Sequence, residues 1–409
     1  MSANQTIVLT GGGILSSLGN GVETFWQNLL ADQAGVGIRE DWTIPEIGTQ
    51  YFGTCQPFTF TEAFSKLKPP FPLKYSQLAM MACHLAFQHA GLSMDELTPE
   101  RVGLLLDTSF GANAAAEEFL IKLFQAGPAK VSPFTFTKTT VNCALGDVAR
   151  TFGIKGPSSM SLGENSVCYG YDLLQDGKAD VVVCGGFDEV REITLWSYAE
   201  RKYLLSPKSD GQPVDLPNNT STDNEVMVMG EASAFVVLET LEHAKARGAT
   251  IYAELVDYHA QNDRDYREFM HTRSEDDLTS TMNGVLRRSN TSPSSVGLVV
   301  GGACLPQHLS GAEGNAIRRI WPTDDLYYTT LKGRIGETFS ASGIASLLTA
   351  ALALRDKVVP GTGYASTEPT DGLRIPETTT TYESEKDYAL VNSWHASGNN
   401  VSLLLKRAA

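Results

Sequence analysis

Cysteine is the residue type in this chain with the widest chemistry, because a thiolate can act as a nucleophile or bind a metal. Six cysteines occur, at positions 55, 83, 143, 168, 184 and 304. No two have C-x-x-C spacing and no histidine follows at zinc-site spacing, so the sequence predicts neither a metal centre nor a redox dithiol. The chain is 42% hydrophobic and can build a core without cross-links, so we expect free, buried thiols.

A glycine run after the first apolar segment is one requirement of a nucleotide-binding loop. The run is Gly11-Gly12-Gly13, and the position of the third motif glycine holds Ser16. No Asp or Glu closes a second strand about 20 residues further on, where such loops need a ribose ligand. We therefore interpret the glycines as a tight first turn.

The charge balance excludes nucleic acid as a partner. The chain has 47 acidic and 32 basic residues, which gives a net charge of −15, whereas phosphate binding needs clustered Lys and Arg. The N-terminus lacks the basic region of a signal peptide. No stretch approaches the ~18 uncharged apolar residues of a membrane helix. We expect a cytoplasmic protein with no membrane contact.

Short apolar runs that end in glycine or a small polar residue alternate with helical patterns, which predicts an α/β fold with strands buried on both faces. The predicted strands are residues 7–10, 102–106, 179–184, 234–238, 252–256 and 296–300, and the predicted helices are residues 75–90, 166–174 and 341–354. The pattern occurs twice, so we divide the chain into an N-terminal half, 1–250, and a C-terminal half, 251–409. The polar stretches Asp210 to Glu225 and Ser366 to Asp387 are predicted surface loops.

Five blocks of the chain, in order, resemble those of the β-ketoacyl synthases of the thiolase superfamily. They are IVLTGGGILSSLGNGVETFWQNLLADQAGVGI (7–38), GIKGPSSMS (153–161), DGKADVVVCGGFDEV (176–190), GEASAFVVLE (230–239) and NSWHASGNNVSLLLKR (392–407). The resemblance covers nearly the whole chain. It implies a thiolase-like αβαβα layered fold, built from two pseudo-equivalent halves and normally dimeric. We expect no cofactor and no metal.

The resemblance also implies where the family's chemical residues would stand. Family members carry the acyl chain on a Cys at a strand-to-helix elbow, and counting from the flanking blocks places that Cys within Met160–Asn165, which contains no thiol. Cys168 falls inside the following helix and is expected to be a packed core thiol. The two family histidines fall at Gly302 and Glu337, and the family lysine at Lys332. A carboxylate cannot donate as an imidazole does, so we expect no catalytic residue and a structural Lys332, paired with Glu337.

A ketosynthase scaffold without its chemical residues is similar to the chain-length factors, the non-catalytic subunits of type II polyketide ketosynthases. The resemblance implies an active ketosynthase as heterodimer partner, a shared tunnel that sets polyketide length, and an acyl carrier protein that docks mainly on the partner. Matched by position, the tunnel residues are Asn113, Ala116, Phe119 and Leu120, on a helix of about 112–124, and the partner-interface residues are Phe134, Phe136 and Thr137.

Two alternatives stay open at this point. One is an active condensing enzyme with a displaced nucleophile, either Cys168 or Cys304, although no histidine stands at a family position. The other is a stand-alone scaffold that binds acyl chains without a catalytic partner. His308 falls in a predicted loop beginning at Pro306, and we assign it no chemical role. The product, its length and the choice between aromatic and polyene pathways do not follow from the residues.

Overall fold

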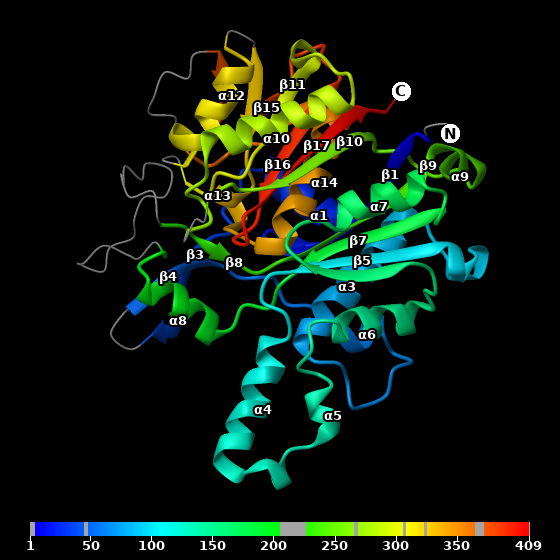
Figure 1. Ribbon diagram of the computed structural model, residues 1–409, viewed down its shortest axis with the longest axis vertical. Coiled ribbons are helices and arrows are strands. Elements are labelled where there is room, and N and C mark those ends of the chain that lie inside the picture. Colours follow the sequence, from blue (N-terminus) through cyan, green and yellow to red (C-terminus); the bar gives the residue numbers. More distant parts are fainter. Residues whose placement is uncertain are drawn as a thin grey trace.

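The computed structural model describes residues 5–44, 48–204, 226–265, 269–305, 308–322, 325–364 and 372–408 (Figure 1). In these residues one mixed sheet of twelve strands dominates. Its strands are β1 (Ile7–Ser16), β2 (Gly19–Asn20), β5 (Val102–Thr108), β6 (Ser158–Leu162), β7 (Val181–Phe187), β9 (Ser233–Thr240), β10 (Ala253–Asn262), β11 (Val296–Val300), β12 (Leu326–Thr329), β14 (Leu373–Arg374), β16 (Tyr388–Trp394) and β17 (Asn399–Arg407). The order is β14-β12-β11-β16-β17-β10-β1-β9-β7-β5-β6, with β2 beside β1. The antiparallel pair β1–β10 joins strands from before and after residue 250.

Helices cover both faces of this sheet. Others lie in a middle layer, between the block of strands that includes β7 and β9 and the block that includes β16 and β17. The helices are α1 (Val22–Leu30), α2 (Phe60–Ala63), α3 (Lys74–Ala90), α4 (Asn113–Ala126), α5 (Pro133–Phe136), α6 (Cys143–Phe152), α7 (Ser166–Gln175), α8 (Glu192–Glu200), α9 (Leu241–Ala246), α10 (Glu275–Arg288), α12 (Gly314–Ile320), α13 (Lys332–Ile335) and α14 (Ser342–Asp356). Helix α3 packs on β1, β9 and β7, and α10 packs on β10 and β17. Helices α7 and α14 lie between the two blocks of strands. This arrangement confirms the thiolase-like αβαβα layers.

Two smaller sheets complete the described structure. They are formed by β3 (Gly37–Ile44), β4 (Gly48–Gly53) and β8 (Met229–Gly230), and by β13 (Val358–Val359) with β15 (Thr380–Thr381).

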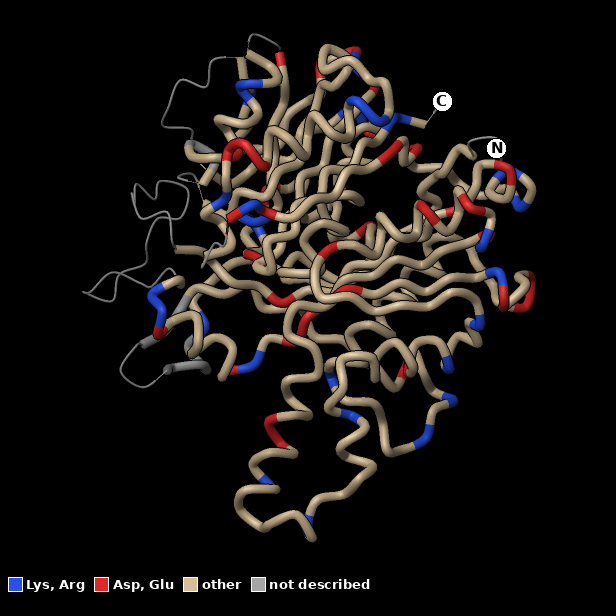
Figure 2. The backbone as a smooth tube through the Cα atoms, viewed as in Figure 1, with Lys and Arg blue, Asp and Glu red and all other residues tan. Residues whose placement is uncertain are grey.

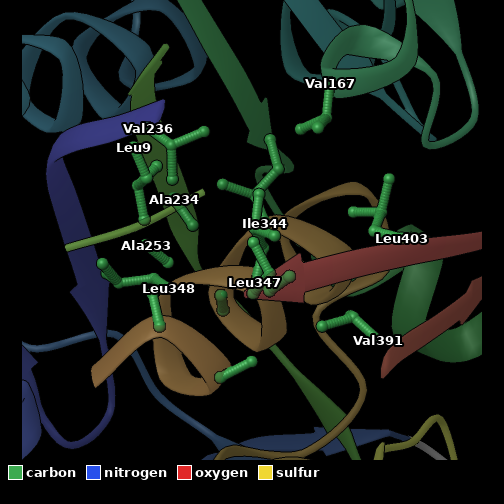
Figure 3. Packing of buried hydrophobic residues seen from close by; sticks show 14 of the residues in the cluster. Leu9, Val167, Ala234, Val236, Ala253, Ile344, Leu347, Leu348, Val391 and Leu403 are labelled. Carbon is green, nitrogen blue, oxygen red and sulfur yellow. The ribbon is translucent and has the colours of Figure 1, made fainter. Parts of the chain in front are cut away.

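The core is centred on α14, whose residues 342–354 are all buried. Figure 3 shows Leu347 and Leu348 of this helix between side chains of β1 and β9, such as Leu9, and side chains of β16 and β17, such as Val391 and Leu403. A helix that is apolar on every side must be covered on every side. Its Ala- and Leu-rich sequence therefore fits the middle layer of the fold.

The structure corrects two expectations from the sequence. Strand β1 continues through the glycines to Ser16 instead of turning, because the glycines pair with β9. Glycine is needed where α3 crosses over the strand, since a Cβ on Gly11 would lie 2.5 Å from the Cβ of Ala90. The described part of Ser366 to Asp387 contains β14 and β15, so it is not only loop. The stretch from Asp210 to Glu225 lies outside the described residues.

Candidate functional site

The elbow between β6 and α7 contains the window in which the sequence places the family cysteine. After β6, Gly163 has a φ of 134°, and α7 begins at Ser166 with Asn165 at its N-cap. Met160 lies inside β6, paired with Leu106 of β5. The residue at the start of the helix, where a nucleophile would meet the backbone N–H groups, is therefore Asn165.

A buried carboxyl group already occupies the N-terminus of α7. Asp107, near the end of β5, accepts a hydrogen bond from the backbone N–H of Ser166 at 2.7 Å. Burial raises the pKa of Asp107 to about 7, although hydrogen bonds from Ser166 and Asn165 act to lower it. A helix N-terminus favours an anion. Here a carboxyl group of the protein itself takes that place, and it is an anion above about pH 7.

Glu164 brings a second carboxyl group to the elbow. Its side chain is buried and accepts no hydrogen bond from the residues that the structure describes. One of its oxygens lies 2.5 Å from where a Cβ on Gly343 would stand, so the glycine at the start of α14 makes room for it. Burial raises the pKa of Glu164 well above its usual value; Lys332 acts to lower it, and the negative charge of Glu337 raises it further.

The pair expected between Lys332 and Glu337 forms, with 2.6 Å between Nζ and Oε2. Oε1 of Glu337 accepts hydrogen bonds from the backbone N–H of Phe339 at 2.9 Å and the hydroxyl of Ser342 at 2.8 Å. Burial opposes ionisation of Glu337, but Lys332 and His271 outweigh it and hold the pKa of Glu337 below its usual value. At neutral pH the carboxylate is an acceptor with its hydrogen-bonding capacity largely used.

Two histidines that the sequence did not single out as a pair stack beside this ion pair. The rings of His271 and His308 are 4.5 Å apart and nearly parallel, at 6°. Nε2 of His271 lies 3.2 Å from Oε2 of Glu337. Burial lowers the pKa of His271 to about 4, so the ring is neutral at pH 7. His308 is buried and caps the helical turn Leu309–Glu313, instead of lying in the predicted loop.

Gly302, where the sequence places the first family histidine, is covered by Trp394. A Cβ on Gly302 would lie 2.5 Å from the Trp394 ring, so no side chain fits there. The backbone N–H of Gly302 donates to Glu313 at 3.1 Å, which fixes the strand end. The ammonium of Lys332 lies 5.3 Å from the centre of the Trp394 ring, within the range of a cation–π interaction. The tryptophan thus fills the space of a side chain and contacts the lysine.

Neither candidate thiol is set up as a nucleophile. Cys168 is buried inside α7, where burial raises its pKa well above the usual value. Burial also raises the pKa of Cys304 to about 12, and its thiol donates to the carbonyl oxygen of Val228 at 3.5 Å. Because the thiolate is the reactive form, burial disfavours nucleophilic attack by either cysteine. The expectation of a core thiol at position 168 is confirmed.

A cavity of about 240 Å³ lies next to this centre without reaching it. Its walls are formed by Ser197, Tyr198, Arg201, Tyr203, Phe269, Met270 and Ala396. Lys332, Glu337 and Glu164 are not among the lining residues, although Met270 and Ala396 directly precede and follow two buried histidines, His271 and His395. A molecule in the cavity would contact aromatic residues and Arg201, and not the Lys332–Glu337 pair or Glu164.

The predicted tunnel and interface residues lie together on an arm formed by α4 and α5, which projects from the body (Figure 1). The rings of Phe119 and Phe136 are 5.6 Å apart and hold the two helices together. Leu120 is 45%, Phe134 64% and Phe136 56% exposed. Of the other predicted residues, Asn113 and Ala116 are half-buried and Thr137 is exposed. In the single chain, this arm is an exposed apolar surface.

The edge of the main sheet is exposed next to this arm. Strand β6 ends the sheet at one side, and Leu162 at its end is 58% exposed. Figure 2 shows both acidic and basic residues along the arm, so its exposed apolar side chains lie among charged ones. Unpaired strand edges and large apolar patches are uncommon on proteins that act as monomers. The surface is therefore of the kind that a second subunit covers.

The chain belongs to the β-ketoacyl synthase family. Sequence profiles of the β-ketoacyl synthase N-terminal domain and C-terminal domain match residues 4–244 and 252–364. This agrees with the layered fold and with the elbow between β6 and α7.

In the described residues, no helix is long and apolar enough to cross a membrane. In the same residues, no cluster of three or more His, Cys, Asp or Glu is arranged to hold a metal.

Relatives of two kinds are similar to the chain over its full length. The 3-oxoacyl-[acyl-carrier-protein] synthase 2 of Vibrio harveyi is 28% identical over 421 residues, with 100% of both chains covered. The protein of that name from Staphylococcus aureus strain COL is 27% identical, with 100% of this chain and 99% of the relative covered. Among solved structures, the ishigamide ketosynthase/chain length factor has a TM-score of 0.87 at 22% identity and covers 100% of both chains. A ketosynthase bound to the hexaketide, in complex with a type II polyketide acyl-carrier protein, has a TM-score of 0.84 at 22% identity, with 99% and 100% covered.

Breaking the Lys332–Glu337 pair should destabilise the fold, because removal of one partner leaves the other charge buried. We expect Lys332→Met to lower the free energy of unfolding by about 3–5 kcal/mol, and Lys332→Met with Glu337→Gln to cost less than the sum of the single changes. Urea unfolding of the purified protein measures both. Lys178→Met, which breaks an exposed pair with Asp176, is the control and should have little effect. Additive single effects would contradict a coupled pair.

Asp107 should make stability depend on pH in the direction opposite to an ordinary ion-paired carboxylate. Its pKa is raised from 3.8 to about 7 in the folded chain, so its contribution is present at low pH and lost as the pH rises through about 7. Asp107→Asn mimics the protonated form. We expect the free energy of unfolding of Asp107→Asn, relative to that of the wild type, to rise by up to about 1.4 kcal/mol per pH unit between pH 3.8 and about 7. A difference that stays constant in urea unfolding from pH 5 to 8 would show that Asp107 does not titrate there.

Proposed function

We propose that this chain is the non-catalytic chain-length factor of a type II polyketide synthase, acting in the cytoplasm with an active ketosynthase. The observation that carries the proposal is the buried Lys332–Glu337 ion pair, because Glu337 stands where the family's second histidine would act. Asn165 at the elbow and Gly302 under Trp394 support the same conclusion. The likeness to a ketosynthase/chain length factor structure agrees with it at the level of the fold.

The alternative is an active condensing enzyme, since the sequence relatives are named 3-oxoacyl-[acyl-carrier-protein] synthases. Such an enzyme would need Cys168 or Cys304 as a displaced nucleophile. Burial raises the pKa of both thiols, and the thiol of Cys304 donates to a backbone carbonyl. These surroundings favour the non-catalytic role.

The proposed partner covers β6 and the arm of α4 and α5. Obligate interfaces bury roughly 2,000–5,000 Å² and are more apolar than the rest of a protein surface. The exposed Phe134, Phe136 and Leu162 supply such a surface. Asn113, Ala116, Phe119 and Leu120 share the arm, so a chain growing in the partner would extend along residues that the two subunits enclose together.

We place the docking of the acyl carrier protein mainly on the ketosynthase partner. A chain of net charge −15 repels an acidic protein except at local clusters of Lys and Arg. The sequence has two pairs of adjacent arginines, Arg287-Arg288 and Arg318-Arg319. Both are partly neutralised, because Arg288 binds Asp257 at 3.0 Å and Arg319 binds Asp276 at 2.6 Å. Neither offers a strong site for an anionic partner.

Charges on the arm should prevent assembly. We expect Phe134→Asp with Phe136→Asp to abolish co-purification with the ketosynthase, because each places a carboxylate in an apolar interface. The matched control is Phe71→Asp, at a phenylalanine that is 37% exposed and lies outside the arm. Size-exclusion chromatography of the co-expressed subunits measures the outcome. An intact complex with the double variant would refute this interface, and a well-behaved monomer that binds acyl chains would favour the stand-alone scaffold.

A larger side chain at Ala116 should shorten the product. Ala116→Trp adds a ring where the growing chain must extend, while the condensation chemistry of the partner stays intact. Mass spectrometry of the products should show shorter polyketides at unchanged yield of the complex. Overpacking of a core position would instead cost about 1–3 kcal/mol and reduce the complex. Unchanged product length would mean that Ala116 does not face the tunnel.

A further inference from the structure

Two buried carboxyl groups lie at the start of α7. Asp107 is hydrogen-bonded to the backbone N–H of Ser166, and Glu164 directly precedes Asn165 with its carboxyl group buried. Lys332, whose charge acts on Glu164, is already bound to Glu337. Burial raises the pKa of both carboxyl groups, so their placement here opposes their ionisation.

We propose that Asp107 and Glu164 keep this elbow chemically silent, so that a cysteine placed at position 165 would remain a protonated and unreactive thiol. The inference rests on the proposed function, in which Asn165 stands at the family cysteine position. It goes beyond the loss of the family cysteine, because it attributes the lack of reactivity also to the residues around position 165. A single reversion would then not restore a nucleophile.

A cysteine becomes reactive when its surroundings stabilise the thiolate. Thiol pKa values fall near helix N-termini and near cations, because both stabilise the thiolate. The N-terminus of a helix carries roughly half a positive charge. At α7 the full charge of an ionised Asp107 would outweigh it, and Asp107 occupies the Ser166 N–H whether ionised or not.

The other charged groups around the elbow do not reverse this balance. Those that act on Asp107 and Glu164 are Asp188, Lys332, Glu337 and Arg273. Lys332 is bound to Glu337, and Arg273 forms an ion pair with Asp263. Like charges raise the pKa of an acid. We therefore expect a thiol at position 165 to titrate above its ordinary range.

The test compares Asn165→Cys with Asn165→Cys/Asp107→Asn and Asn165→Cys/Glu164→Gln in the full chain, with its partner where the two co-purify. Alkylation by iodoacetamide is followed from pH 6 to 11, and peptide mass spectrometry reads position 165. The midpoint of the rate gives the thiol pKa regardless of how accessible the half-buried position is. We expect a midpoint at least about one unit above 8.5 in Asn165→Cys, and a roughly tenfold faster rate at pH 7 once Asp107→Asn is added.

The control removes a carboxylate from the other end of the same helix. Asp176→Asn, added to Asn165→Cys, should leave the midpoint unchanged, because Asp176 is the C-cap of α7. Cys168 and Cys304 are buried, so their lack of alkylation shows that each variant is folded. If Asp107→Asn does not fold, the Glu164→Gln variant carries the same test.

A midpoint at or below 8.5 in Asn165→Cys, or one that neither added change lowers, would overturn the inference. That result would leave the proposed function standing, because product length and assembly test it separately. Conversely, unchanged product length in Ala116→Trp would overturn the tunnel role. A high alkylation midpoint in Asn165→Cys would still support the inference about the elbow.

Discussion

The ion pair between Lys332 and Glu337 is the interaction on which the centre of this protein depends. Two opposite charges without access to water are stable only when they are paired and hydrogen-bonded. Glu337 satisfies this condition through Lys332, Ser342 and the backbone of Phe339, and it also lies against His271. These contacts tie α13, the loop after it and the start of α14 together. Glu337, which we propose stands at a family histidine position, thus holds these segments together.

The scaffold around this centre has requirements that do not depend on catalysis, which explains why it is intact. Helix α14 must be covered on all sides, so the strands on either side of it keep their apolar residues. Gly11 and Gly343 give α3 and the Glu164 carboxyl group room to approach. The proposed partner interface, at the exposed β6 edge and the arm of α4 and α5, likewise needs no catalytic group. None of these features depends on a nucleophile.

The sequence predicted what local patterns determine and missed what tertiary contacts determine. Apolar runs and helical spacing located the strands and helices of the layers, and the spacing of Lys332 and Glu337 across one short helix predicted their pair. The stack of His271 on His308 joins segments 37 residues apart, so no helix or strand periodicity in the sequence predicts it. The bond from Ser166 to Asp107 also depends on how β5 lies beside the elbow. Such contacts follow only from the folded chain.

The central claim is that this chain supports condensation without performing it. The most direct measurement uses the reconstituted complex with a ketosynthase partner whose own elbow cysteine is changed to alanine, supplied with labelled malonyl and acyl units on the carrier protein. The account predicts no elongated product and no acyl group on Cys168 or Cys304 by peptide mass spectrometry, while the complex with the intact partner elongates. An elongated product from the altered complex, or an acyl thioester on either cysteine, would contradict it.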